Sequence, residues 1–469
     1  MDLSAYSAWK FIIQIAIIVV VIIIGNIIRR KVPFIKNSLL PSSVLGGIII
    51  FILKFIPGAD KVVDSGFMEI ITYHCLGLGF VALGLKTEKK MKEDRRLIVL
   101  DSGIITVNGY LVQAILGLGA TILLSQFVIK DFFPAAGALL PMGFGQGTGQ
   151  ALNMGKVFEG LGFENGTTFG LSIAAVGFVV ACLVGVLYLN ILKKKGKLSV
   201  QERRINQNNE MKESIYDADE APVNESVDKL TVQLGLIFGV YLVTYGIIYL
   251  GSYLAKSYLG NFGVNTVSPL LWGFNFLFGS LFAILLKKIM RGLKKAKIMT
   301  HQHVNNYLMN RISGFFFDVM IVAGIAAIDW QNLQGLLIPL IMVCVLGTLG
   351  TFFYLKAVCK RIYPTYEYEG FFSYFGMLTG TASTGMILLR EIDPNFETPA
   401  ANNLVLQQLP AIIFGAPILL LIPFAGESLE NAILVFCIVC VLFVVYNIIL
   451  LRRDIFKLGR RKKNVKNKD

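Results

Sequence analysis

Long apolar segments separated by polar loops run through the whole sequence. Segments 11–24, 336–346 and 432–445 contain almost no polar side chains. Each lies within a window of about 20 residues, the length of helix that crosses ~30 Å of hydrocarbon. The pattern predicts eleven membrane-spanning helices, at about residues 8–28, 37–56, 67–85, 97–127, 167–192, 229–255, 266–288, 311–329, 333–357, 402–424 and 428–451.

Composition agrees with this pattern. Hydrophobic residues make up 55% of the 469 residues and charged residues 16%, whereas soluble domains are about half apolar and a quarter charged. We therefore expect an all-α polytopic membrane protein. The first apolar segment lacks the features of a cleaved signal and is expected to remain as a span. The sequence holds no Walker P-loop, nucleophile elbow or H-E-x-x-H segment, so we expect neither ATP-driven transport nor an enzyme.

The net charge of +14 is concentrated in alternate loops. Basic residues follow the first, third, fifth, seventh and eleventh spans, and the loops between them hold few cations. The positive-inside rule then places the N-terminus outside and the C-terminus in the cytoplasm, as expected for a bacterial inner-membrane protein. Orientation, with some attraction to anionic lipid, explains the charge better than nucleic-acid binding does.

A polar segment divides the chain into two hydrophobic halves. Residues 193–228 are rich in charged and amide side chains and are predicted to form a cytoplasmic linker. The first half then covers residues 1–192 and the second 229–425. Residues 426–451 form an extra spanning helix, and residues 452–469 a basic cytoplasmic tail.

Each half contains one short, glycine-rich segment that predicts a re-entrant hairpin. The first hairpin covers residues 134–160 and the second residues 369–394. Each follows the fourth span of its half, and Gly380 follows Gly147 by 233 positions. The charge map makes the two hairpins approach from opposite faces of the membrane. These observations predict an inverted repeat of five transmembrane helices plus one hairpin per half.

The hairpin tips are the candidate binding site. Non-helical backbone in a bilayer is tolerated only where protein or a water-filled cavity surrounds it. Carbonyl groups that end a first arm can coordinate sodium, and N–H groups that begin a second arm can bind an anion. The alternative, that these glycines only allow close helix packing, stays open. The candidate substrate ligands are Gln146, Gly147, Thr148, Gly149, Gln150, Asn153, Thr381, Ala382, Ser383 and Thr384, and the candidate sodium ligands are Gly145, Gly147, Thr379 and Gly380.

Charged residues inside spans are candidates because their burial in lipid is costly. Asp318 and Asp101 are the acidic candidates for an ion site, and Asp318 is included among the candidate sodium ligands. Either carboxylate can instead pair with Arg95, Arg96 or Arg311. Arg390 can clamp an anionic substrate, or it can cap the last arm of the second hairpin. We expect no metal other than sodium, and we interpret the membrane cysteines as packing residues.

The segments GFGQGTGQA (143–151) and GMLTGTASTG (376–385) resemble the glutamate:sodium symporter family. As architecture the resemblance extends over about residues 1–425. It implies sodium-coupled uptake of glutamate or a related anionic amino acid. It also implies an elevator-type transporter and a homodimer. A carrier of 2-hydroxycarboxylates or dicarboxylates, and an ion channel or exchanger, remain alternatives.

Overall fold

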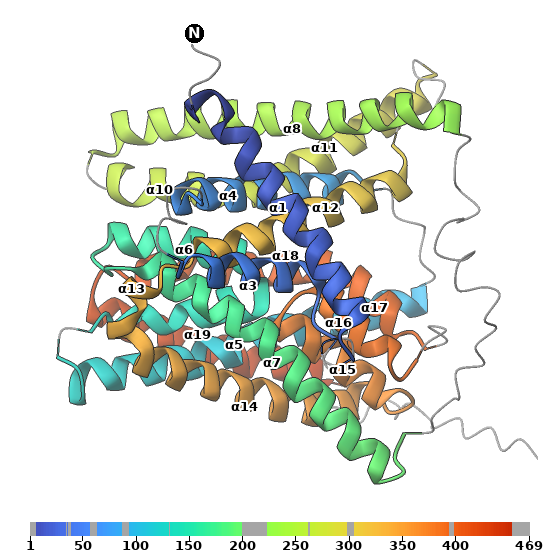
Figure 1. Ribbon diagram of the computed structural model, residues 1–469. Helices are drawn as coiled ribbons and strands as arrows, with labels where there is room; N and C mark the ends of the chain where they lie inside the picture. Colours follow the sequence, from blue (N-terminus) through green and yellow to red (C-terminus); the bar gives the residue numbers. More distant parts are fainter. Residues whose placement is uncertain are drawn as a thin grey trace, which may run out of the picture. The chain divides into compact units, whose positions relative to one another are not determined.

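The computed structural model describes residues 6–33, 35, 39–56, 63–86, 93–130, 132–198, 223–260, 263–297, 304–393 and 398–452 (Figure 1). Regular structure in these residues is entirely helical. Most of the predicted linker, the basic tail after residue 452 and the end of the second hairpin at Pro394 lie outside the described residues. In the first half the α-helices are α1 (Tyr6–Lys31), α3 (Ser42–Leu53), α4 (Ser65–Leu85), α5 (Glu93–Phe127), α6 (Thr148–Gly160) and α7 (Gly166–Lys194).

The second half continues the pattern of long helices. Its elements are α8 (Val223–Tyr258), α10 (Ser268–Gly273), α11 (Asn275–Lys295), α12 (Asn306–Ala327), α13 (Trp330–Leu333), α14 (Leu337–Ile362), α15 (Glu367–Thr379), α16 (Ala382–Arg390), α17 (Ala400–Leu406), α18 (Gln408–Ala425) and α19 (Leu429–Leu450). Eight helical segments of the described chain are long and apolar enough to cross a membrane. A multi-pass membrane protein is thereby supported.

Each of the eleven predicted spans coincides with helical structure, but three differ from a simple spanning helix. The span predicted at 37–56 contains only the 12-residue α3. The span predicted at 266–288 is divided between α10 and α11, and α11 carries a lysine-rich end. The span predicted at 402–424 is divided between α17 and α18, just before Pro410. Proline lacks the N–H that a helix interior requires, which favours a break near its position.

The chain divides into two compact units. The first comprises Met1–Met68, Met91–Val200 and Gly324–Asp469, and the second comprises Glu69–Lys90 and Gln201–Ala323. The division falls inside α4 and inside α12, so each of these helices contributes residues to both units. Both hairpins belong to the first unit.

In the first unit, α5 is the helix against which both hairpins are arranged. It packs against α14, α18, α19 and the start of the first hairpin. The backbones of Gly117 in α5 and Gly137 in the hairpin are in direct contact, since a Cβ atom on either would overlap the other's carbonyl group. The hydroxyl of Thr121 donates to the carbonyl of Pro134 (2.7 Å) and accepts from the N–H of Gly137 (3.0 Å). These contacts fix the start of the first hairpin on α5.

The extra C-terminal helix α19 is also anchored on α5. Arg452, just after α19, donates from Nη1 to Oδ1 of Asp101 at 2.7 Å. The Asp101 side chain is only 4% exposed and that of Arg452 25%. Asp101 is therefore part of a partly buried ion pair, with a partner that the sequence analysis did not name.

The second unit contains a polar cluster among otherwise apolar helices. The hydroxyl of Tyr241 in α8 lies 2.9 Å from Nδ1 of His74 in α4 and accepts from the amide of Asn275 in α11 at 3.0 Å. Tyr73 donates to the backbone carbonyl of Trp272 at 2.8 Å. These bonds join α4, α8, α10 and α11, and the apolar side chains around them form the core of this unit.

Candidate functional site

The first hairpin has an irregular first arm and a regular second arm. The chain forms a 3-10 turn over Pro134–Ala138 and a π-helical turn over Pro141–Gly145. The break follows at Gln146 and Gly147, and α6 then begins at Thr148. Gly147 has φ +83°, a conformation that glycine adopts readily and that strains other residues. The glycine-rich pattern therefore produces the break where the sequence predicted it.

The second hairpin consists of two regular helices. The first arm, α15, ends at Thr379, and α16 begins at Ala382, so the break lies at Gly380 and Thr381. The two arms pack closely because Gly376 and Gly385 face each other; a Cβ atom on Gly376 would lie 2.7 Å from the Cα of Gly385. Stacked aromatic rings, such as Phe371 and Phe375 at 5.5 Å, fill the surroundings of α15.

The structure brings the two tips together. A Cβ atom placed on Gly147 would have one heavy atom of a non-neighbouring residue within 4 Å, the carbonyl oxygen of Gly380 at 4.0 Å. Other hairpin glycines are in tight contact: a Cβ atom on Gly143 would lie 2.6 Å from Ile173 of α7. Gly145 packs against the ring of Tyr110. Most of these glycines thus serve packing, whereas Gly147 faces open space beside the opposite tip.

The beginning of α6 is a buried helix N-terminus that no side chain caps. Thr148, Gly149 and Gln150 are all buried, and the first backbone bond of the helix runs from the N–H of Ala151 to the carbonyl of Gly147. The Gln150 side chain is 1% exposed, and neither of its polar atoms has a hydrogen-bond partner among the described residues. Buried polar groups are normally satisfied, so this end of α6 has the character of a ligand site.

Other predicted residues of the first hairpin surround this end. Asn153 is buried one turn further along α6, and Gln146 is half-buried. Thr148 contacts the last turn of α12, where a Cβ atom on Gly324 would lie 2.6 Å from the Thr148 Cβ. The last turn of α12 therefore closes the first tip on one side.

The N-terminus of α16, in contrast, is capped by its own residues. The hydroxyl of Thr381 accepts from the backbone N–H of Thr384 at 3.3 Å. Thr384 is buried, whereas Thr381 and Ala382 are half-buried. The side chain of Ser383 lies outside the described part of the structure. In the first arm, the hydroxyl of Thr379 donates to the carbonyl of Phe375 at 2.7 Å, which leaves its hydroxyl oxygen as an acceptor.

Two predicted residues are not placed at the tips. Arg390 is exposed at the far end of α16, nine residues after Thr381, which is about 13 Å along a helix that rises 1.5 Å per residue. Asp318 is exposed on the part of α12 that belongs to the second unit. No group of three or more His, Cys, Asp or Glu side chains that would hold a metal ion occurs among the described residues.

Two buried glutamines complete the surroundings of the tips. Gln407 donates to the sulfur of Met377 in α15 at 3.1 Å, and its oxygen has no partner in the described structure. Gln113 in α5 donates to the carbonyl of Leu378 at 2.7 Å. Gln113 is not among the residues predicted from the sequence. An amide in the middle of a long apolar span is the signal that could have identified it.

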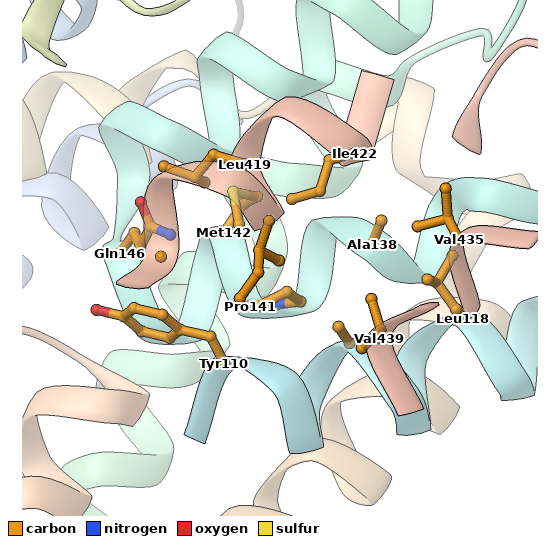
Figure 2. Close-up of a pocket in the computed structure, with 13 residues that line it drawn as sticks. Tyr110, Leu118, Ala138, Pro141, Met142, Gln146, Leu419, Ile422, Val435 and Val439 are labelled. Carbon is orange, nitrogen blue, oxygen red and sulfur yellow. The ribbon is translucent and has the colours of Figure 1, made fainter. Parts of the chain in front are cut away.

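An apolar cavity lies behind the first hairpin, on the side of α18 and α19. It is small, with a cavity volume of about 20 Å³, room for about one water molecule. Figure 2 shows Met142 and Leu419 on its wall, with Gln146 and the hydroxyl of Tyr110 at one end. The lining is otherwise apolar, so this cavity does not suit a carboxylate. The polar groups of the site instead gather at the start of α6.

Comparison with known proteins gives one finding of similarity. A family model described as the sodium/glutamate symporter matches residues 9–398. This range begins within α1, includes all later helices up to α16 and both tips, and ends before α17. A search of curated proteins found no match.

Proposed function

Because the chain belongs to the sodium/glutamate symporter family, we propose that it imports glutamate or a related anionic amino acid together with sodium. The family is one of membrane transporters, and the chain has the apolar helices that a multi-pass protein needs. The proposal for this chain concerns the identity of the acid and the place where it binds.

The observation that carries the proposal is the buried start of α6, without a side-chain cap, beside Gln150, which has no hydrogen-bond partner among the described residues. Backbone N–H groups at a helix N-terminus point toward an anion, and the helix dipole favours negative charge there. A substrate carboxylate would bind the N–H groups of Thr148, Gly149 and Gln150, with the Gln150 amide and Asn153 completing the contacts. This arrangement explains why the Gln150 amide is buried without a hydrogen-bond partner among the described residues.

The second tip would hold the rest of the substrate. Gly380 lies opposite Gly147, so an amino acid bound at α6 is within reach of Thr381, Ala382, Ser383 and Thr384. Arg390, exposed at the end of α16, would attract the anion and is not a direct ligand at the tip. Sodium would bind carbonyl oxygens near Gly145, Gly147, Thr379 and Gly380, because a hard cation prefers oxygen ligands.

The order of the helices supports the proposed inverted repeat. In the first half four helices (α1, α3, α4, α5) precede the first hairpin, and α7 follows it. In the second half α8, α10 with α11, α12 and α14 precede the second hairpin, and α17 with α18 follows. We propose that residues 1–192 and 229–425 are the two repeats, with 193–228 as linker and α19 as an addition. The N-terminus would lie outside and the C-terminus in the cytoplasm of a bacterial inner membrane.

The transport mechanism we propose is of the elevator type. The unit that holds both hairpins would carry the substrate across the bilayer, and the other unit would form a homodimer. The support for this proposal is the division of the chain into two units, with both hairpins in one of them. Asp318, on the part of α12 that belongs to the other unit, is proposed as an acidic ligand of the sodium site.

Uptake into proteoliposomes tests the function. We expect an inward sodium gradient to drive accumulation of labelled glutamate, with weaker accumulation of dicarboxylates and 2-hydroxycarboxylates. Accumulation of a dicarboxylate or a 2-hydroxycarboxylate in preference to glutamate would change the substrate but keep the mechanism. Sodium-independent uptake, or current that needs no substrate, would contradict symport and favour a channel or an exchanger.

A further inference from the structure

Gln113 lies in the middle of α5 and connects the two hairpins. Its side chain is fully buried. The side-chain nitrogen donates to the backbone carbonyl of Leu378 at 2.7 Å and to the hydroxyl of Thr351 at 2.9 Å. Leu378 precedes Thr379, the last residue of the first arm of the second hairpin. Gln113 therefore holds the second tip from the side of α5.

These two bonds determine which way the amide points. The oxygen and nitrogen of a glutamine side chain are assigned from their hydrogen-bonding partners. If the amide were reversed, its oxygen would lie 2.7 Å from the Leu378 carbonyl oxygen, and two acceptors at that distance repel each other. The nitrogen thus faces the second hairpin, and Oε1 faces away from it.

Oε1 of Gln113 lies beside the first hairpin, and it accepts no hydrogen bond from the described residues. It lies 3.2 Å from the point where a Cβ atom of Gly145 would be placed. Among the described residues no donor reaches this oxygen. A buried acceptor without a partner destabilises a fold, so its presence between two re-entrant tips points to a ligand that the chain itself does not supply.

The groups near Oε1 indicate what kind of ligand it is. Gly145 ends the π-helical turn Pro141–Gly145, and the last carbonyl groups of a helical turn lack intrahelical partners. One of them, that of Gly143, accepts from the N–H of Gly147 at 3.2 Å. Amide and carbonyl oxygens are ligands of hard cations, so an amide oxygen beside the backbone of Gly145 favours a cation over an anion or a second acceptor.

We propose that Oε1 of Gln113 is a ligand of the coupling sodium ion, together with backbone carbonyls at the end of the first arm. The assignment rests on the symport proposed above and names a side chain of its ion site. One amide would thus bind the ion through its oxygen and the second hairpin through its nitrogen. Sodium binding at the first tip is thereby linked to the position of the second.

The test compares two isosteric substitutions at the ends of one hydrogen bond. Gln113→Met removes the oxygen, whereas Thr351→Val removes a partner of the nitrogen and leaves Oε1 in place. The readout is stabilisation of the purified protein by sodium chloride alone, with choline chloride as the salt control. We expect Gln113→Met to raise the half-saturating sodium concentration about tenfold or more, and Thr351→Val to change it less than about twofold, a factor of ten being 1.4 kcal/mol.

Equal shifts in the two variants, or no shift in Gln113→Met, would overturn the assignment. If Gln113→Met does not fold, Gln113→Asn provides the same test, because it keeps the amide and withdraws the oxygen by one methylene group. Wild-type protein with no response to sodium would overturn the proposed symport and the ligand together. A wild-type response that Gln113 variants leave unchanged would overturn the ligand alone.

Discussion

The two hairpins share a plan but differ at the point where their second arms begin. In the second hairpin the hydroxyl of Thr381 caps α16, and both arms are regular helices. In the first hairpin the arm before the tip is a 3-10 and a π-helical turn, and no side chain caps α6. The first tip also holds Gln150, buried and without a hydrogen-bond partner among the described residues. This difference supports the proposal that the first hairpin keeps polar groups for a ligand, whereas the second caps its own helix.

The largest effect is expected where a glycine of α5 packs against the first hairpin. Gly117→Ala places a methyl group against the Gly137 carbonyl, and we expect this overlap with backbone to reach or exceed the upper end of the ~1–3 kcal/mol that overpacking costs. We expect loss of folded protein, measured by size-exclusion chromatography of the detergent extract. Gly119→Ala is the control on the same helix, because its methyl meets only the edge of the Phe436 ring at 3.3 Å. Equal yields of the two variants would contradict the packing role.

The tip glycine should behave differently from Gly117. Gly147→Ala forces φ +83° on an alanine, at a cost of about 1–3 kcal/mol, but its methyl meets no close neighbour. We expect folded protein with a reduced melting temperature and uptake reduced more than about tenfold. Gly160→Ala, at the far end of α6 with open space around it, should keep both properties. If the uptake of Gly147→Ala falls only in proportion to the amount of folded protein, Gly147 serves packing and not binding.

Replacing Gln150 tests whether its buried amide lowers the stability of the fold and serves to bind the substrate. Gln150→Leu removes two unsatisfied polar atoms, so we expect an unchanged or higher melting temperature. Glutamate affinity should fall about ten- to hundredfold, equivalent to ~1–3 kcal/mol for a lost hydrogen bond. Gln150→Glu should weaken binding further because its charge repels the carboxylate. Calorimetric titration at saturating sodium measures the glutamate affinity of both variants. An unaltered affinity in both would show that the acid does not bind at Gln150.

The cap of the second hairpin should matter mainly for folding. Thr381→Ala removes the acceptor for the N–H of Thr384, and loss of a helix N-cap costs about 1 kcal/mol. We expect a lower melting temperature without ligand, and Thr381→Ser should restore it. If Thr381→Ala loses more glutamate affinity than Gln150→Leu does, the second tip and not the first is the main binding site for the acid.

The smallest effect is expected at Asp64, outside both hairpins, which forms an ion pair with Lys10. The hydrogen bond from Lys10, and then that from the backbone N–H of Phe67, lower the pKa of Asp64 below its ordinary value. A lowered pKa stabilises the folded state above the unfolded pKa of about 3.9, and this stabilisation disappears as the pH falls below it. The Lys10 side chain is over a third exposed, so we expect the ion pair to contribute less than about 1 kcal/mol to the free energy of unfolding. Asp64→Asn should remove this part of the pH dependence of the melting temperature between pH 3 and 6; an unchanged profile would contradict it.

The hydrophobic pattern predicted helical structure in all eleven segments, but it did not predict that three of them are short or divided. The glycine clusters coincide with the breaks between helices. Residues 146–147 and 380–381 separate the arms within the predicted hairpins. The pattern was not sufficient for the partners of single polar residues. Asp101 pairs with Arg452, 351 positions away, and Gln113 bonds to Leu378, 265 positions away. Such contacts depend on how helices that are distant in sequence pack together, and the local periodicity of a sequence does not predict this packing.

The same limit applies to the two ends of the hairpins. Both tips contain Gly-Thr pairs, Gly147-Thr148 and Gly380-Thr381. In the first tip Thr148 is already inside the helix, whereas in the second Thr381 is the cap before it. A shift of one residue in the start of the helix decides which tip is satisfied, and helix boundaries are uncertain by more than that when predicted from sequence.

The central claim is that the two tips form one site in which sodium and an acid bind together. Melting temperatures of the purified wild-type protein across a panel of small acids, each with and without sodium, test it most directly through the linkage of binding to stability. We expect glutamate, or a closely related anionic amino acid, to stabilise the protein strongly in sodium and little in choline. Equal stabilisation in both salts, or none by any acid, would contradict it.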